Sequence, residues 1–347
     1  MKKMVKYLVW IFFIFFVSCK PHQEQKLPKN TERAFYFWKS VFKLTDHEKD
    51  IVDSLHVSTI YLKFFDVEWN EANRQPNPVA QLSVADKDYL QKINIIPVVF
   101  ITNESILKID SLQSIPFAEK ICKLLNEMAA INKLTKINEL QIDCDWTAST
   151  KEKYFTLLKK IKQLTTPWKL SATIRMHQVK FMEKSGVPPV DKGLLMCYNM
   201  GNLRNPATNN SIIETAELKK YIGNVHKYPL PLDVAFSLFD WYVLFRNENY
   251  SGLIKNMPDS VFKNSFSQRN ENRFTFLKDT FLMGYQFKKN DVLRYENSDY
   301  NSIISSAKDV NNKLTERETR VSLYHLDSIT LSKYTIHEME NIYNSIH

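Results

Sequence analysis

The chain has 347 residues, of which 44% are hydrophobic and 13% aromatic, enough apolar material to bury a substantial core. Its formal net charge is +9, but the basic residues are spread along the sequence, so the charge does not indicate a nucleic-acid partner. Only 6 glycines occur and none belongs to a glycine-rich phosphate-binding motif, so we expect no nucleotide and no other cofactor.

The N-terminal segment has the features of an export signal. Lysines within residues 2–6 precede an unbroken apolar run over residues 7–17. A run of this length cannot cross a bilayer, because a membrane-spanning helix needs about 20 apolar residues. A short apolar run after basic residues is typical of a signal peptide.

The apolar run ends in F-V-S-C, residues 16–19, which resembles the lipobox of bacterial lipoproteins. The resemblance implies that residues 1–18 are a lipoprotein signal peptide and that Cys19 carries acyl chains such as palmitate. Several acyl chains would anchor the protein to a membrane of the bacterial envelope, which we expect to be the outer membrane, facing the periplasm or the outside. The alternative is an ordinary secretory signal with a chance cysteine. Residues 19–32 are polar and contain proline, which predicts a flexible tether before one folded domain over residues 33–347.

Strand and helix patterns alternate through this domain. We expect strands over residues 34–40, 58–67, 95–102, 138–147, 169–177, 193–200, 232–239 and 321–327. We expect helices over residues 46–55, 86–92, 116–134, 150–164, 216–225 and 300–314, with a further helix at the C-terminus. Residues 70–83 are predicted to be a loop. Residues 250–290 interrupt the alternation of strands and helices, and we expect them to be an insertion that includes a hairpin.

Eight strands with intervening helices predict an α/β fold, a (β/α)8 TIM barrel with an insertion between strands 7 and 8. An open doubly wound sheet is the competing fold, but it usually begins with a glycine-rich turn that is absent here. No C-x-x-C pair occurs, and Cys122, Cys144 and Cys197 fall on helix or strand patterns. We expect these thiols to be buried and inert, and we expect no metal site.

Two acids lie on one face of the predicted strand 138–147. Asp143 and Asp145 alternate with apolar residues, and at the C-terminal end of a barrel strand they would face the mouth where such barrels carry their sites. Neighbouring carboxylates cannot both ionise freely, so one of the two can retain its proton and serve as an acid. The alternative is a structural salt bridge to Arg175. Glu68, after the strand 58–67, is a third candidate catalytic carboxylate, whose alternative is a solvated loop position.

Other strand ends carry candidate substrate-binding residues. Arg175 and His177, at the end of the strand 169–177, could bind an acidic group of a sugar or could be ordinary structural polar residues. Trp69, Trp146 and Trp241 are all predicted at strand ends, where aromatic faces can stack on sugar rings, although tryptophan also fills cores.

Two short segments resemble a known family. Residues 142–147 (I-D-C-D-W-T) are similar to the D-x-D-x-E signature of family 18 chitinase-like glycoside hydrolases, and residues 196–199 (M-C-Y-N) resemble their M-x-Y-D motif. The resemblance implies a TIM barrel with a sugar-shaped cleft. The departures are that Thr147 stands at the position of the family's proton-donating glutamate and Asn199 at the position of its strand-6 aspartate.

The same resemblance suggests roles for individual residues. Asp143 and Asp145 match the two aspartates of the family signature, and Tyr198 matches the tyrosine that touches the sugar. The first hypothesis is therefore an envelope lipoprotein, expected to be a monomer, that processes a glycan with Asp145 as acid/base, tuned by Asp143. Tyr198, Asn199 and the tryptophans would hold the carbohydrate. Two alternatives remain: an inactive barrel that binds a glycan or a partner protein, and a purely structural envelope component.

Overall fold

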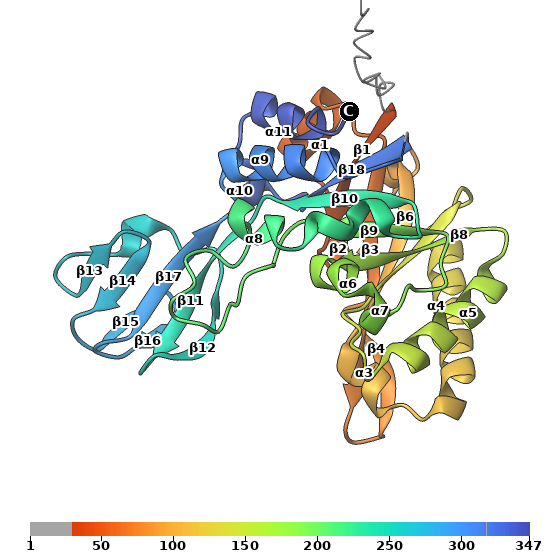
Figure 1. Ribbon diagram of the computed structural model, residues 1–347, viewed down its shortest axis with the longest axis horizontal. Coiled ribbons are helices and arrows are strands. Elements are labelled where there is room, and N and C mark those ends of the chain that lie inside the picture. Colours follow the sequence, from red (N-terminus) through yellow and green to blue (C-terminus); the bar gives the residue numbers. More distant parts are fainter. Residues whose placement is uncertain (1–29, 317) are drawn as a thin grey trace, which may run out of the picture.

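A computed structural model describes residues 30–316 and 318–347 as a closed barrel of parallel strands with helices around it (Figure 1). The barrel strands are β1 (Asn30–Phe37), β3 (Thr59–Asn70), β6 (Asn94–Ile101), β7 (Glu139–Asp143), β8 (Lys169–Arg175), β9 (Lys192–Met196), β10 (Leu232–Ser237) and β18 (Glu318–Tyr324). Each strand pairs in parallel with the next in this order, and the pairing of β18 with β1 closes the ring. The predicted (β/α)8 fold is confirmed. The predicted signal peptide and Cys19 lie outside the described residues.

Two strands have other boundaries than predicted: β1 starts earlier and β7 ends earlier. β1 begins at Asn30, within the predicted tether, because its first residues pair with β18 and Glu32 accepts a 2.9 Å hydrogen bond from Arg320. At the other end, β7 stops at Asp143, so Asp145 lies in the loop that follows the strand.

The helices cover the outside of the barrel. They are α1 (Asp46–Ser54), α2 (Lys87–Leu90), α3 (Asn103–Lys108), α4 (Ser114–Ile131), α5 (Lys151–Thr165), α6 (Met176–Lys180), α7 (Met182–Ser185), α8 (Thr215–Lys219), α9 (Tyr300–Asn311), α10 (Ser328–Leu331) and α11 (Ile336–Tyr343). The start of α1 was readable from the sequence, because Thr45 and Glu48 form a reciprocal capping box there. Within the described residues, no helix is both long enough and apolar enough to cross a membrane.

The predicted loop over residues 70–83 is wrong in part. β4 (Gln75–Val79) folds back and pairs antiparallel with the end of β3, so the two strands extend beyond the barrel as a hairpin. The loop prediction failed because two prolines in β4 argue against a strand, whereas the strand lies at the edge of the sheet, where proline is tolerated.

A second sheet lies between β10 and α9 in the chain and projects from one side of the barrel, on the left of Figure 1. Its strands, in spatial order, are β12 (Asn249–Ile254), β11 (Asp240–Arg246), β17 (Val292–Asn297), β14 (Arg273–Phe276) and β13 (Ser267–Asn270). A ribbon of β15 (Thr280–Leu282) and β16 (Tyr285–Phe287) adds to it. The sheet is wider than the predicted irregular region over 250–290, because β11 and β17 pair with each other from outside that range. It buries a small core of its own around Phe274, Phe276 and Leu293.

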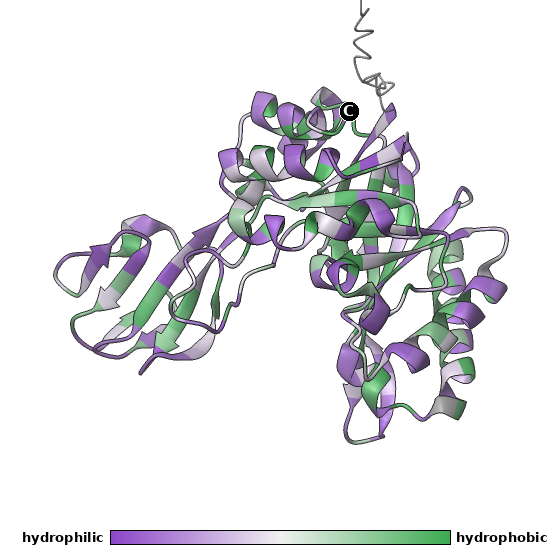
Figure 2. Cartoon of the chain, in the orientation of Figure 1, coloured by the Kyte–Doolittle hydropathy of each residue, from purple (hydrophilic) through white to green (hydrophobic). Residues whose placement is uncertain are grey.

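Hydrophobic residues concentrate along the barrel strands, and hydrophilic residues on the outer turns of the helices (Figure 2). The N-terminal part of the barrel interior is polar instead. Arg320 of β18 donates hydrogen bonds to Glu139 and to the Tyr61 hydroxyl, and Lys192 forms a 2.6 Å ion pair with the buried Asp233. These paired charges fill the barrel interior at its N-terminal end, whereas a cavity is found at the C-terminal end. Cys122, Cys144 and Cys197 are buried and free, as predicted.

Candidate functional site

A cavity of about 450 Å³ opens at the C-terminal ends of the barrel strands, between the barrel and the antiparallel sheet. It is lined by aromatic side chains and by several charged ones. The aromatic lining residues are Tyr36, Trp38, Phe100, Tyr198, Phe239, Trp241 and Tyr324. The ionisable lining residues other than tyrosine are Lys39, Asp143, Asp145, Arg175, Asp240, Lys255, His325 and Asp327. Such a mixture of apolar faces with a few polar groups is typical of a small-molecule or sugar site.

Asp143, the last residue of β7, forms part of the cavity floor. It is only 9% exposed, and the Thr173 hydroxyl of β8 donates a 2.5 Å hydrogen bond to its Oδ1. Burial, and then the nearby Asp145 carboxylate, raises the pKa of Asp143 from 3.8 to about 6. Of the two aspartates, Asp143 is therefore the one that retains a proton at mildly acidic pH.

Asp145 has a different environment two residues further on. Its side chain is half-exposed, and Arg175 holds it with two hydrogen bonds, 2.6 Å from Nε to Oδ1 and 2.7 Å to Oδ2. This bidentate geometry is the strong form of an arginine–carboxylate pair. The two alternatives weighed from the sequence thus apply to different residues: the raised pKa belongs to Asp143, and the salt bridge to Arg175 belongs to Asp145.

The other two acids of the lining are also engaged. Asp327 accepts backbone N–H groups at the start of α10 and pairs with Lys39 at 2.8 Å. Asp240 pairs with Lys333 at 2.5 Å and accepts a hydrogen bond from the Tyr295 hydroxyl. These acids shape the wall of the cavity through contacts with the protein itself.

Aromatic rings form a connected arc around the cavity. The centroid of Tyr324 lies 5.7 Å from that of Trp38 and 5.8 Å from those of both Tyr198 and Phe239. Trp241 continues the arc, 5.0 Å from Phe239. The Phe239–Tyr324 contact is edge to face and the other contacts are tilted. Rings packed in this way hold one another in place and present fixed apolar surfaces to a ligand.

Several predicted binding residues meet at this cavity. Tyr198, Asn199, Arg175 and Trp241 line it, and the Oδ1 atom of Asn199 is shielded from solvent without a hydrogen-bond partner among the described residues. His177 lies in an adjoining cavity of about 180 Å³, which shares Arg175, Tyr198 and Asn199 with the larger one. His177 is therefore next to the site rather than inside it.

Besides His177, three further predicted residues do not line the larger cavity. Glu68 is exposed on the part of β3 that pairs with β4, so the hairpin carries both it and Trp69 beyond the mouth. Trp146 points the opposite way to Asp145, because neighbouring residues of an extended chain alternate in direction. It is buried, stacks on Tyr154 of α5, and donates a hydrogen bond to the Ser185 carbonyl. The prediction that these side chains face the mouth is wrong.

Sequence reasoning missed several lining residues. Trp38 and Tyr324 stand at the ends of β1 and β18, so the strand-end rule that selected the other tryptophans would have found them. Lys255 and Asn256 come from the antiparallel sheet, and no sequence pattern indicates that this sheet reaches the barrel mouth.

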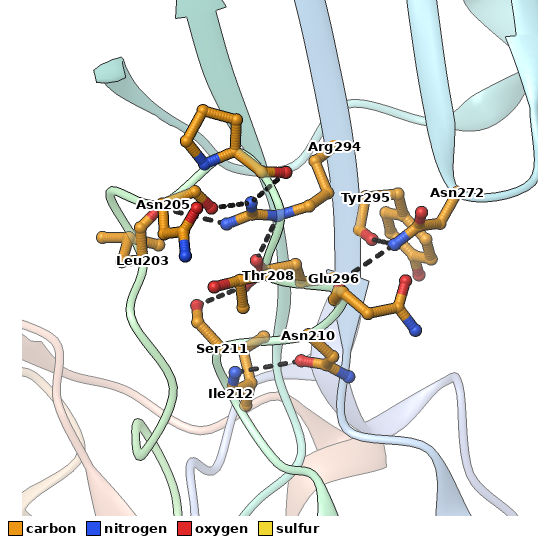
Figure 3. A network of polar contacts seen from close by, with 12 residues as sticks. Leu203, Asn205, Thr208, Asn210, Ser211, Ile212, Asn272, Arg294, Tyr295 and Glu296 are labelled. Carbon is orange, nitrogen blue, oxygen red and sulfur yellow. Dashed lines mark hydrogen bonds and ion pairs between the residues drawn. The ribbon is translucent and has the colours of Figure 1, made fainter. Parts of the chain in front are cut away.

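A buried ion pair connects the antiparallel sheet to the loop after β9 (Figure 3). Arg294 and Glu296 of β17 are fully buried and lie 2.7 Å apart. Arg294 also donates to the Leu203 and Asn205 carbonyls of the loop after β9, while Glu296 accepts from Ser211 and from the indole N–H of Trp241. The pair thereby fixes the orientation of the Trp241 ring.

The raised pKa of Asp143 predicts a pH-dependent stability. Because the folded-state pKa lies above the unfolded value, the contribution of Asp143 is complete below about pH 4 and is lost as the pH rises through about 6. Between pH 4 and pH 7.5 the protein should lose roughly 2–3 kcal/mol of unfolding free energy relative to the variant Asp143→Asn. Denaturant unfolding of both proteins at the two pH values measures this difference, and parallel pH profiles would contradict it.

Comparison with known proteins supports the fold. No protein-family model matches the chain, and no curated protein matches its sequence. Among solved structures, the spore cortex-lytic enzyme SleL of Bacillus cereus is similar with a TM-score of 0.51 and 13% identity, over 92% of this chain and 75% of that one. A chitinase from Chromobacterium violaceum has a TM-score of 0.53 and 10% identity, over 91% and 97%. A chitinase from Bacteroides thetaiotaomicron has a TM-score of 0.50 and 11% identity, over 91% and 97%.

These similarities establish the (β/α)8 fold. The resemblance to chitinase-like barrels, predicted from two short segments, is thus confirmed in the architecture. At such low identity the activity does not transfer with the fold, so the function of this chain has to be argued from its own cavity.

Proposed function

We propose that the cavity binds a sugar residue of a glycan and that the protein acts as a glycan-binding barrel rather than an efficient hydrolase. The observation that carries the proposal is the arc of aromatic rings around a polar floor at the mouth of the barrel. Sugar rings offer apolar C–H faces that stack on aromatic side chains, and hydroxyl groups that hydrogen-bond to polar ones. Structural neighbours named as chitinases support a carbohydrate ligand.

The side chains of the cavity argue against efficient hydrolysis. Glycoside hydrolysis by the usual route needs two carboxyl groups on either side of the bond, one as acid and one as base or nucleophile. Asp145 is held by Arg175, which occupies both of its carboxylate oxygens. Thr147, at the position of the family's proton donor, is exposed and bonds to the Ser149 hydroxyl at 2.8 Å. Glu68 lies outside the cavity, so it cannot replace the missing group.

A second candidate function, slow glycan cleavage, is favoured by Asp143 alone. A carboxyl group with a pKa of about 6 is a suitable general acid in mildly acidic solution, because much of it is protonated there. If the protein cleaves a glycan, the rate should be highest below about pH 6 and should fall above it.

The proposed location is the surface of a bacterial membrane. The basic segment, the short apolar run and Cys19 motivate a lipid anchor, with residues 19 to 29 as spacer before β1. Metabolic labelling with a palmitate analogue tests this proposal: label should be incorporated into the full chain and lost in Cys19→Ala.

Binding and cleavage are separated by one pair of measurements. Calorimetric titration of the full chain with a tetrasaccharide of N-acetylglucosamine should give saturable binding, while long incubation should release no new reducing ends. Turnover that is lost in Asp143→Asn but kept in Glu68→Gln, an acid outside the cavity, would establish the second candidate. Absence of binding to any glycan would refute both.

A further inference from the structure

Most of the charged side chains that line the cavity form ion pairs with other described residues of the protein, and one lysine does not. Arg175 holds Asp145, and Lys39 lies 3.2 Å from Glu48 and 2.8 Å from Asp327. Lys255 is exposed at the rim and has no ion pair among the described residues. Since the acids of the wall are already engaged, the ammonium group of Lys255 is the cation available to a ligand.

Lys255 is held at the rim by the packing of its neighbours. It follows the last residue of β12, Ile254, which is buried in the small core of the antiparallel sheet, and Met257 is buried in the same core. Only Lys255 and Asn256 are exposed between these two anchors, and Asn256 takes a left-handed conformation with φ of 57°. The turn is therefore fixed at both ends and carries its charge at the cavity.

His325 supplies a second polar group to the same cavity. The Nδ1 atom of His325, which follows β18, is shielded from solvent and has no hydrogen-bond partner among the described residues. Burial lowers the pKa of His325 to about 4, the Asp327 carboxylate raises it, and the Lys39 and Lys255 ammonium groups lower it. His325, Lys39 and Lys255 all line the same cavity. A buried polar atom without a partner is costly, and a ligand that bonds to it would recover that cost.

We infer that this rim, formed by Lys255 and His325 beside Lys39, accepts a carboxylate group on the glycan, so that the cavity prefers acidic sugars over neutral ones. The inference rests on the proposed function and adds the chemical class of its ligand. A carboxylate offers two acceptor oxygens, which suit the ammonium group of Lys255 and an N–H group on Nδ1 of His325.

The test compares three tetrasaccharides of equal length on the full chain in detergent. The first contains only N-acetylglucosamine, the second alternates it with N-acetylmuramic acid, which bears a carboxylate, and the third is the methyl ester of the second. Calorimetry at low salt should show the acidic tetrasaccharide binding about tenfold more tightly than its ester, as expected for one charge-assisted contact. The preference should shrink at high salt.

Two variants assign the preference to the rim. Lys255→Gln should remove the difference in affinity between acid and ester, measured as the ratio of the two affinities within the same variant. Lys263→Gln, at an exposed lysine of the same region that does not line the cavity, should keep the difference. Equal affinity for acid and ester, or a preference that survives Lys255→Gln, overturns the inference while the proposed function stands. Failure of all three tetrasaccharides to bind overturns both.

Discussion

Replacing Arg294 by alanine should cost about 3–5 kcal/mol of unfolding free energy, the largest stability effect that we expect from one substitution. The reason is that Glu296 is fully buried and would keep its negative charge without a positively charged partner. The backbone carbonyls of Leu203 and Asn205 would also lose their donors. Denaturant unfolding measures the loss. The variant should also release the Trp241 ring from its fixed orientation, so the affinity for sugar should fall together with the unfolding free energy.

Two further variants test the cause. Arg269→Ala breaks an exposed ion pair with Asp259 in the same sheet and should cost no more than about 1 kcal/mol. The double variant Arg294→Met with Glu296→Leu removes both buried charges and should recover much of the lost stability. If Arg294→Ala is no more harmful than Arg269→Ala, the buried pair does not hold the sheet to the barrel.

Replacing Trp38 by alanine should weaken glycan binding about 30-fold, the largest effect on binding that we expect from a single residue. Trp38 lines the cavity as part of the aromatic arc, with Phe100 on one side and Tyr324 on the other. Removing a central aromatic anchor of a binding site commonly costs 2 kcal/mol or more, which corresponds to this factor. The affinity of wild type and variant for the N-acetylglucosamine tetrasaccharide measures the effect.

Trp69 supplies a matched control. It also stands near the end of a barrel strand, but it lies outside the cavity, where it donates a 3.1 Å hydrogen bond to Glu71. Trp69→Ala should therefore leave the affinity unchanged. Equal losses in the two variants would mean that aromatic truncation acts through general destabilisation rather than through contact with the sugar.

Most of the fold was predictable because the periodicity of the sequence is strong. Each barrel strand was found, since strands buried on both faces leave long apolar runs such as residues 95–102. The hairpin of β3 with β4 was missed because prolines mask an edge strand. The full width of the antiparallel sheet was missed because the pairing of β11 with β17 joins segments about 50 residues apart, which periodicity cannot reveal.

The candidate site was predictable only where side-chain direction follows from the strand. Asp143 and Arg175 could be placed because the alternation of a strand decides which residues point inward. Trp146 was misplaced because the alternation that brings Asp145 to the mouth turns its neighbour to the opposite side, and Glu68 was misplaced because β3 continues past the barrel into a hairpin. The two aspartates differ because Asp143 is buried, which raises its pKa, while Asp145 is half-exposed and paired with Arg175 of the neighbouring strand, so only the three-dimensional arrangement distinguishes them.

The most direct test of the account is a crystal structure of the protein with the N-acetylglucosamine tetrasaccharide. A sugar ring should lie inside the cavity, in contact with Trp38 or Trp241 and within hydrogen-bond distance of Asp143. A sugar bound elsewhere on the surface, or an empty cavity at a concentration that saturates binding in solution, would contradict it.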